Sequence, residues 1–299
     1  SIVVPRVFSI ISMAFWRKMV LLFSATLAVF IWQAVFQISK GELEVYFLDV
    51  GQGDAVFIET PSGNQILIDG GPDKSVVSNL SRVMPFYDRS IDMVIPTHPQ
   101  SDHFGGLVDV FKQYDVDIFV ENGLRGDSPL YQELERLIEN AGTERKIARV
   151  GERMLLDRNL RLDIIAPLES ILAAGEKNPN EVMIVGRLVY GETTFLFTGD
   201  MEKTEEISLA LSNFDLDSDI LKVAHHGSKN SSTLLFLEKV TPSIAVISSG
   251  NNRYGHPHKE ALDRLSSIGA RILRTDKEGT ILITSDSDSF EVVNHPDIL

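Results

Sequence analysis

The chain has 299 residues, 43% of them hydrophobic and 23% charged, which excludes a largely disordered protein and leaves room for one large domain or two modest ones. It has no cysteine, so disulfides and thiolate metal sites are excluded as well. The formal net charge of −14 gives a surface that repels polyanions and counts against nucleic acid as a substrate.

The first forty residues differ from the rest of the chain. An uncharged, apolar stretch runs from Met19 to Ser39, and as a helix it would be about 31 Å long, close to the hydrocarbon thickness of a bilayer, about 30 Å. We expect residues 1–40 to be a membrane segment, the end of a longer polytopic membrane region; a signal peptide and a buried core helix are the alternatives. Basic residues before Met19 place the remainder, 41–299, outside the cytoplasm.

After residue 40, short runs rich in β-formers alternate with amphipathic helical runs. We predict strands over residues 43–48, 55–59, 65–68, 93–95, 118–120, 162–165, 182–190, 194–197, 221–224, 244–247, 281–284 and 290–293. We predict helices over residues 106–114, 129–141, 203–211, 234–239 and 259–268. Because strands alone and then strand–helix units occur in both halves, the pattern predicts two α/β halves that pack sheet on sheet with helices outside.

Histidine is concentrated in this chain. Six of the seven histidines fall in three clusters, each directly after an apolar, strand-like run: His98 with His103, His225 with His226, and His256 with His258. Neutral imidazole and carboxylate are ligands for zinc or manganese, and catalytic metal sites gather them on loops at strand ends. The clusters therefore predict a metal-dependent hydrolase.

Two carboxylates accompany these histidines. Asp102 directly precedes His103 in a loop that must turn sharply for both to reach one metal, and the following Gly105 permits that close approach. Asp200 ends another strand after a turn glycine. A carboxylate can bridge two metals, which a neutral imidazole cannot do, so we interpret Asp200 as a bridge; a helix N-cap is the alternative.

The paired histidines do not have equal roles. Adjacent side chains on an extended backbone face opposite ways, so only one of His225 and His226 is expected to bind metal unless the chain bends there. The other orients it or acts on the leaving group. Likewise, only one of His256 and His258 is expected to bind metal. At each of these four positions, the alternative is a histidine with a purely structural role.

Further polar residues stand on neighbouring loops. Asp69 closes an apolar run and suits a carboxylate that fixes a ligand imidazole. Asp49 and Asp54 frame a glycine-rich loop that no helix follows, so we interpret it as a floor of the same site, with a plain turn as the alternative. Basic residues on the histidine loops would hold substrate phosphates beside Ser228; they are Lys229, Arg253 and Lys259.

Together these residues resemble a known family. The motifs Thr-His98-x-x-x-Asp102-His103-x-Gly-Gly, Thr-Gly-Asp200 and the strand-end Asp69 are similar to the metallo-β-lactamase superfamily. Four further motifs narrow the resemblance to the C-terminal domain of the ComEC family of competence DNA-uptake proteins: Leu-Asp49-Val-Gly-Gln-Gly-Asp54-Ala, His225-His226-Gly-Ser, Tyr-Gly-His256-Pro-His258, and Arg274-Thr-Asp276 followed by Gly279-Thr280. The match covers residues 42–294.

The resemblance implies an αββα four-layer sandwich over residues 41–299 with a binuclear site between the sheets. In that family's pattern His98 serves the first metal, Asp102 and His103 the second, and Asp200 both. His225, His226 and His256 complete the metal shells. It also implies a nuclease that degrades the non-transported strand of incoming DNA, next to the membrane channel part of the same protein and other competence proteins.

This sequence departs from the family's pattern at two positions. Gln100, a neutral and weaker ligand, replaces the usual histidine or aspartate, and we place it beside the ligands rather than among them. Met183 replaces a common serine. We therefore expect one or two divalent ions, zinc or manganese, with the first site weakened.

Three functions remain open at this point. The main hypothesis is phosphodiester hydrolysis, with Asp102, His226 and His258 as catalytic residues. Hydrolysis of a small phosphoester is the second, because one scaffold serves many substrates. A degenerate, non-catalytic domain that guides DNA at a membrane pore is the third, and Gln100 is its main support.

Overall fold

The computed structural model describes residues 8–38, 41–167 and 182–293 and separates into two compact units, Ser1–Gly41 and Glu42–Leu299. The first unit holds helix α1, Phe8–Ile38. Within the described residues, no helix combines the length and the apolarity needed to cross a membrane. The membrane segment expected over residues 1–40 stays a prediction. His295, the one histidine that belongs to none of the three clusters, lies outside the described residues.

The second unit contains an eight-stranded sheet in the order β15-β14-β1-β2-β3-β4-β5-β6. Its strands are β1 Leu43–Phe47, β2 Val56–Glu59, β3 Gln65–Ile68, β4 Ser90–Ile95, β5 Asp115–Glu121, β6 Glu144–Ile147, β14 Ile281–Ser285 and β15 Phe290–Val293. The pairs from β15 to β3 are antiparallel, and those from β3 to β6 are parallel. The loops after β3 and β4 therefore leave the same edge of the sheet.

A seven-stranded sheet in the order β13-β12-β11-β10-β9-β8-β7 forms the other half. Its strands are β7 Arg153–Asp157, β8 Leu160–Ala166, β9 Val185–Tyr190, β10 Thr193–Phe197, β11 Ile220–Lys222, β12 Ile244–Ile247 and β13 Arg271–Arg274. Strands β10 to β13 are parallel, whereas β7 to β10 are antiparallel. The loops after β10, β11 and β12 again share one edge.

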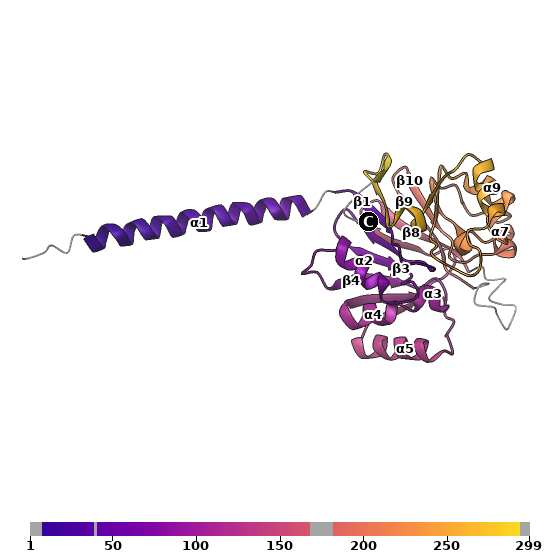
Figure 1. Ribbon diagram of the computed structural model, residues 1–299, viewed down its shortest axis with the longest axis horizontal. Helices are drawn as coiled ribbons and strands as arrows, with labels where there is room; N and C mark the ends of the chain where they lie inside the picture. The colour runs from indigo at the N-terminus through magenta and orange to yellow at the C-terminus, as the bar shows by residue number, and fades with distance from the viewer. Residues whose placement is uncertain (1–7, 39–40, 168–181, 294–299) are drawn as a thin grey trace, which may run out of the picture. The chain divides into compact units, whose positions relative to one another are not determined.

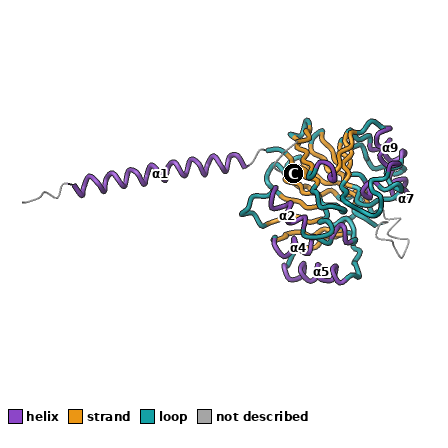
Figure 2. Tube along the Cα trace, viewed as in Figure 1, coloured by secondary structure: helices purple, strands orange, loops and turns teal. Residues whose placement is uncertain are grey.

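Helices cover the outer face of each sheet (Figures 1 and 2). On the eight-stranded side are α2 Ser75–Val83, α3 Ser101–Phe104, α4 Leu107–Gln113 and α5 Pro129–Ala141. On the seven-stranded side are α7 Lys203–Ala210, α8 Leu234–Val240, α9 Lys259–Ser267 and the short α10 Thr275–Glu278. The predicted αββα four-layer sandwich is confirmed.

Three buried clusters hold these layers together. The central cluster joins inward side chains of both sheets, among them Phe47 and Phe195, which are fully buried. A second cluster packs α2, α4 and α5 on the first sheet, and a third packs α7, α8 and α9 on the other. Fully burying one side chain of the size of Phe stabilises the fold by about 1.5–3 kcal/mol. Because each cluster contains many buried side chains, the sandwich is a rigid support for the loops at its edge.

The sequence pattern missed three strands, and all three lie at sheet edges. They are β6, β7 and β13. An edge strand pairs on one side only and carries more polar residues, so it lacks the apolar alternation on which the prediction depends. In β6, Glu144 and Lys146 are exposed, and no run of buried residues marks the strand.

Candidate metal centre

The loop after β4 brings His98, Asp102 and His103 to one edge of the first sheet. Asp69, directly after β3, accepts hydrogen bonds from the Thr97 backbone N–H (2.7 Å) and hydroxyl (2.9 Å). The same carboxylate accepts a hydrogen bond from His103 Nδ1 at 2.9 Å. A proton on Nδ1 leaves the lone pair of Nε2 free, so the position of Asp69 suits the role predicted for it, a strand-end carboxylate that orients a ligand imidazole.

The loop after β11 presents two histidines together. Strand β11 ends at Lys222, and Ala224–Gly227 forms a 3₁₀ turn in which His225 and His226 have φ of 50° and 51°. Because this backbone is not extended, the expected alternation of the two side chains is absent. His225 Nε2 lies 3.8 Å from Asp200 Oδ2, and His226 Nε2 lies 3.7 Å from Asp200 Oδ1.

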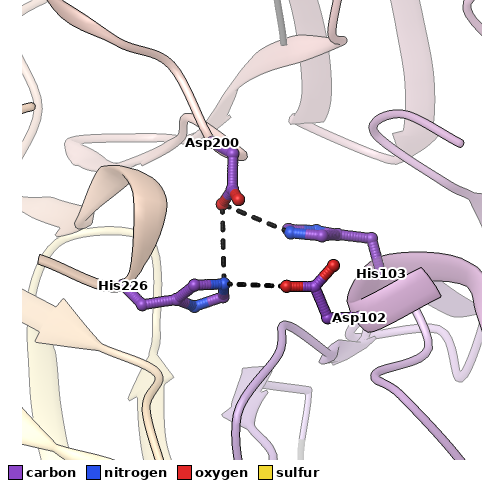
Figure 3. Close-up of side chains that lie close together, drawn as sticks. All are labelled: Asp102, His103, Asp200 and His226. Carbon is purple, nitrogen blue, oxygen red and sulfur yellow. Dashed lines mark ion pairs between the residues drawn. The ribbon is translucent and has the colours of Figure 1, made fainter. Parts of the chain in front are cut away.

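Four side chains from the two sheets converge on one point (Figure 3): Asp102, His103, Asp200 and His226. One ligand atom of each lies within 4.8 Å of the others. His103 Nε2 is 3.2 Å from Asp200 Oδ1, and His226 Nε2 is 3.6 Å from Asp102 Oδ2. Two imidazoles and two carboxylates at this spacing form a ligand set that suits zinc or manganese.

Atoms without hydrogen bonds give a direct test of this fit. Among the buried side chains that the structure describes, the atoms His98 Nε2, His103 Nε2, Asp200 Oδ1 and His226 Nε2 have no hydrogen-bond partner. Buried polar atoms are almost always paired, because leaving one unpaired costs about 1–3 kcal/mol. A divalent cation at the cluster would satisfy the last three of these atoms, so the residues present fit a metal.

The electrostatics of the cluster also favour a cation. Burial alone would raise the pKa of Asp200, but His103 and His226 hold it well below its usual range. Burial lowers the pKa of His226, yet Asp200 and Asp54 raise it to about 10. By contrast, burial and the neighbouring His103 lower the pKa of His98 to about 3. The carboxylates thus attract positive charge to the centre, whereas His98 stays neutral.

The cluster opens into a cavity of about 840 Å³. The cavity is lined by Gln52, Gln100, Ser101, Asp102, Asp200, His225, His226, Asn251, Asn252, Arg253, Tyr254 and His256. The structure therefore brings seven of the residues singled out in the sequence to one cavity. Arg253 is exposed on its wall, with its guanidinium over the ring of Tyr254.

Other residues singled out in the sequence lie beside the cavity or away from it. His258 Nδ1 accepts a hydrogen bond from the backbone of Lys229, whose side chain is exposed. Ser228 is buried, and its hydroxyl accepts from the Asn230 backbone. Asp49 is exposed and accepts from Gly51 within its own turn. These four side chains do not line the cavity.

Among the neighbours of the site that sequence reasoning missed, three contact residues singled out in the sequence. Lys222 is almost fully buried and pairs with Asp54. Glu202 Oε1 lies 3.3 Å from His225 Nδ1, and Tyr254 stacks on His256. Lys222 left a signal, because it is a charged residue inside the apolar run that leads to His225.

Comparison with known proteins agrees with this geometry. A family model of the metallo-beta-lactamase superfamily matches residues 48–250. The chain belongs to this superfamily. Its αββα fold and its His/Asp cluster together imply a divalent-metal site of a hydrolase.

Two relatives identify a narrower family within the superfamily. The chain is 29% identical to ComE operon protein 3 of Bacillus subtilis, over 83% of this chain and 34% of that protein. It is 28% identical to competence protein ComA of Neisseria gonorrhoeae, over 82% of this chain and 32% of that protein. These relatives confirm the resemblance to the ComEC family. The chain spans only about a third of their length.

A solved structure supports the fold alone. The metallo-beta-lactamase fold protein YhfI from Bacillus subtilis matches with a TM-score of 0.56 at 12% identity, over 82% of this chain and 99% of that protein.

Proposed function

We propose that this metallohydrolase cleaves phosphodiester bonds of DNA. The observation that carries the proposal is the convergence of Asp102, His103, Asp200 and His226 on one point at the wall of a polar cavity. A divalent cation there, zinc or manganese, would activate water and stabilise the charge that develops on phosphoryl oxygens. The expected second cation would involve His98, His225 and His256.

The chain's own side chains contribute binding and orientation. Asp69 and Asp54 lie against Nδ1 of His103 and His226 and keep their Nε2 atoms aimed at Asp200. Arg253 is exposed on the cavity wall, where its guanidinium can pair with a phosphate that flanks the cleaved bond. His258 does not line the cavity, so its predicted role as proton donor has no direct support.

The choice of DNA rests on the relatives. One of them is named competence protein ComA, another ComE operon protein 3 and a third recombination protein 2. We propose that, within a longer membrane protein, this unit degrades the non-transported strand outside the cytoplasm, beside the channel part and other competence proteins. A cysteine introduced at the exposed Ser289 can be labelled with an impermeant thiol reagent in intact cells, and cells that make the protein without this substitution give the background labelling. Protection from the reagent would contradict this placement.

A small phosphodiester is the second candidate. The net charge of −14 opposes a polyanionic substrate, and a cavity of about 840 Å³ has the size of a small-molecule site. Labelled DNA should compete with bis(p-nitrophenyl) phosphate if both use this site. Cleavage of the small ester with no competition by DNA would favour the second candidate.

The decisive experiment compares the purified chain with its Asp200→Ala variant on labelled DNA, with manganese or zinc. We expect the variant to be at least about 100-fold slower, because Asp200 faces both His103 and His226. Asp92→Asn, a change away from the cluster, is the control. Equal cleavage by the wild type and Asp200→Ala would sink the proposal, and metal binding without cleavage would favour a non-catalytic DNA-guiding domain.

A further inference from the structure

A buried ion pair lies behind the metal centre. Lys222, the last residue of β11, donates from Nζ to Asp54 Oδ2 at 2.6 Å, although the two residues are 168 positions apart. Their side chains are 2% and 4% exposed. Desolvating two charges costs several kcal/mol, so such a pair is weak evidence of a contribution to stability, and its presence calls for another explanation.

The ion pair ends on a residue of the metal centre. The other oxygen of Asp54, Oδ1, lies 3.2 Å from His226 Nδ1, and the Ser248 carbonyl accepts from the same nitrogen at 3.0 Å. Both neighbours of Nδ1 are acceptors, so Nδ1 keeps its proton and Nε2 is the nitrogen whose lone pair would bind a cation at the cluster. The carbonyl alone would set this tautomer; the carboxylate adds negative charge, which makes the imidazole a stronger ligand.

The backbone around Asp54 links it to the other side of the centre. The Asp54 N–H donates to the Asp102 carbonyl at 3.2 Å, and the Asp54 carbonyl accepts from Gly71 at 2.7 Å. A Cβ on Gly53 would lie 2.4 Å from the Asp102 carbonyl oxygen, so only glycine allows the two loops to approach this closely. Asp54 is therefore held between the Asp102 loop and His226.

Lys222 lies outside the space that is open to a substrate. It is buried, does not line the cavity, and its second contact is the Val223 carbonyl at 3.1 Å. We propose that Lys222 is a positioning residue of the metal centre, which holds Asp54 against His226 and thereby keeps His226 Nε2 directed at Asp102 and Asp200. The inference rests on the proposed function only in that the cluster binds a divalent cation.

Metal affinity, measured together with folding stability, tests the inference. The variants are Lys222→Met, Asp54→Asn and the double variant. The control is an exposed ion pair of β6, changed to Lys146→Met with Glu144→Gln. Zinc affinity is measured by competition with a chromophoric chelator, and stability by urea unfolding of the metal-free chain. Each single change leaves one buried charge unpaired and should destabilise the fold, whereas the double variant should recover most of the stability.

The double variant separates the two roles. We expect its zinc affinity to stay about 10- to 100-fold below that of the wild type, the usual effect of losing a partner that orients a ligand. The control pair should bind zinc as the wild type does. If the double variant does not fold, Lys222→Gln with Asp54→Asn, which keeps a hydrogen bond between the two positions, takes its place.

Two outcomes would overturn the inference in distinguishable ways. A stable double variant that binds zinc as tightly as the wild type shows that the pair is only structural, and the proposed function stands. A wild-type chain that binds no zinc or manganese overturns the proposed function and the inference with it.

Discussion

Three imidazoles of the site have a carboxylate beside Nδ1. The pairs are His103 with Asp69 at 2.9 Å, His226 with Asp54 at 3.2 Å, and His225 with Glu202 at 3.3 Å. The Nε2 atoms of all three lie 3.2 to 3.8 Å from Asp200. Asp200 is thus the centre of the arrangement, and the outer carboxylates fix the rings around it.

We expect a single residue, Gln100, to limit the number of bound metals. Its amide lines the cavity beside Asp102, and a neutral amide is a poorer ligand than imidazole. We expect elemental analysis of the dialysed wild-type chain to find about one tightly bound zinc, and Gln100→His to raise the ratio towards two.

Gln100→Asn, which keeps an amide, is the matched control and should leave the ratio unchanged. Two tightly bound zinc ions in the wild type would contradict the role assigned to Gln100.

At the scale of elements, a buried carboxylate connects α7 to the start of α8. Glu206 in α7 accepts from the backbone N–H groups of Ser232 (2.5 Å) and Thr233 (2.7 Å), just before the first residue of α8. Burial raises the pKa of Glu206 to about 7, although these hydrogen bonds oppose the shift. The folded chain therefore binds the proton more tightly than the unfolded chain does.

This contact makes stability depend on pH. The contribution of protonated Glu206 to the free energy of unfolding is complete below about pH 4.5. It is lost as the pH rises through about 7. Between pH 5 and 7.5 the loss is about 2 kcal/mol, because one pKa unit corresponds to about 1.4 kcal/mol. We expect urea unfolding at these two pH values to show this difference between the wild type and Glu206→Gln. Parallel pH curves for the two proteins would contradict the assignment.

At the scale of the whole molecule, the metal ligands come from both halves of the sandwich. Asp102 and His103 follow β4 of one sheet, whereas Asp200 and His226 follow β10 and β11 of the other. A cation bound by all four connects the two sheets at their shared edge. Metal binding should therefore stabilise the entire second unit rather than one loop.

Zinc at 100 times its dissociation constant should raise the free energy of unfolding by about 2.7 kcal/mol, provided that the unfolded chain does not bind it. Urea titrations of the wild type with zinc and with a chelator measure the difference, and Asp200→Ala should show little of it. A wild type that unfolds at the same urea concentration in both conditions would refute the cross-sheet role.

The local sequence pattern was enough to predict the central strands and several residues of the site. The central strands were predictable because both of their faces are buried and their apolar runs are continuous, as in Ile244–Ile247. Asp69, Asp102 and Asp200 were recognisable because they follow such runs. Edge strands such as β6 were not, since one free side leaves them without an apolar signature.

Contacts between distant segments required the tertiary structure. The αL backbone at His225 and His226, which directs both rings to Asp200, depends on how the turn after β11 packs, and the alternation rule for strands cannot anticipate it. The contact of Lys222 with Asp54 joins positions 168 residues apart. Residue types and strand-end positions thus determined which chemistry is available, and the packing of the two sheets decided which side chains meet, because ligand geometry arises only when separate loops converge.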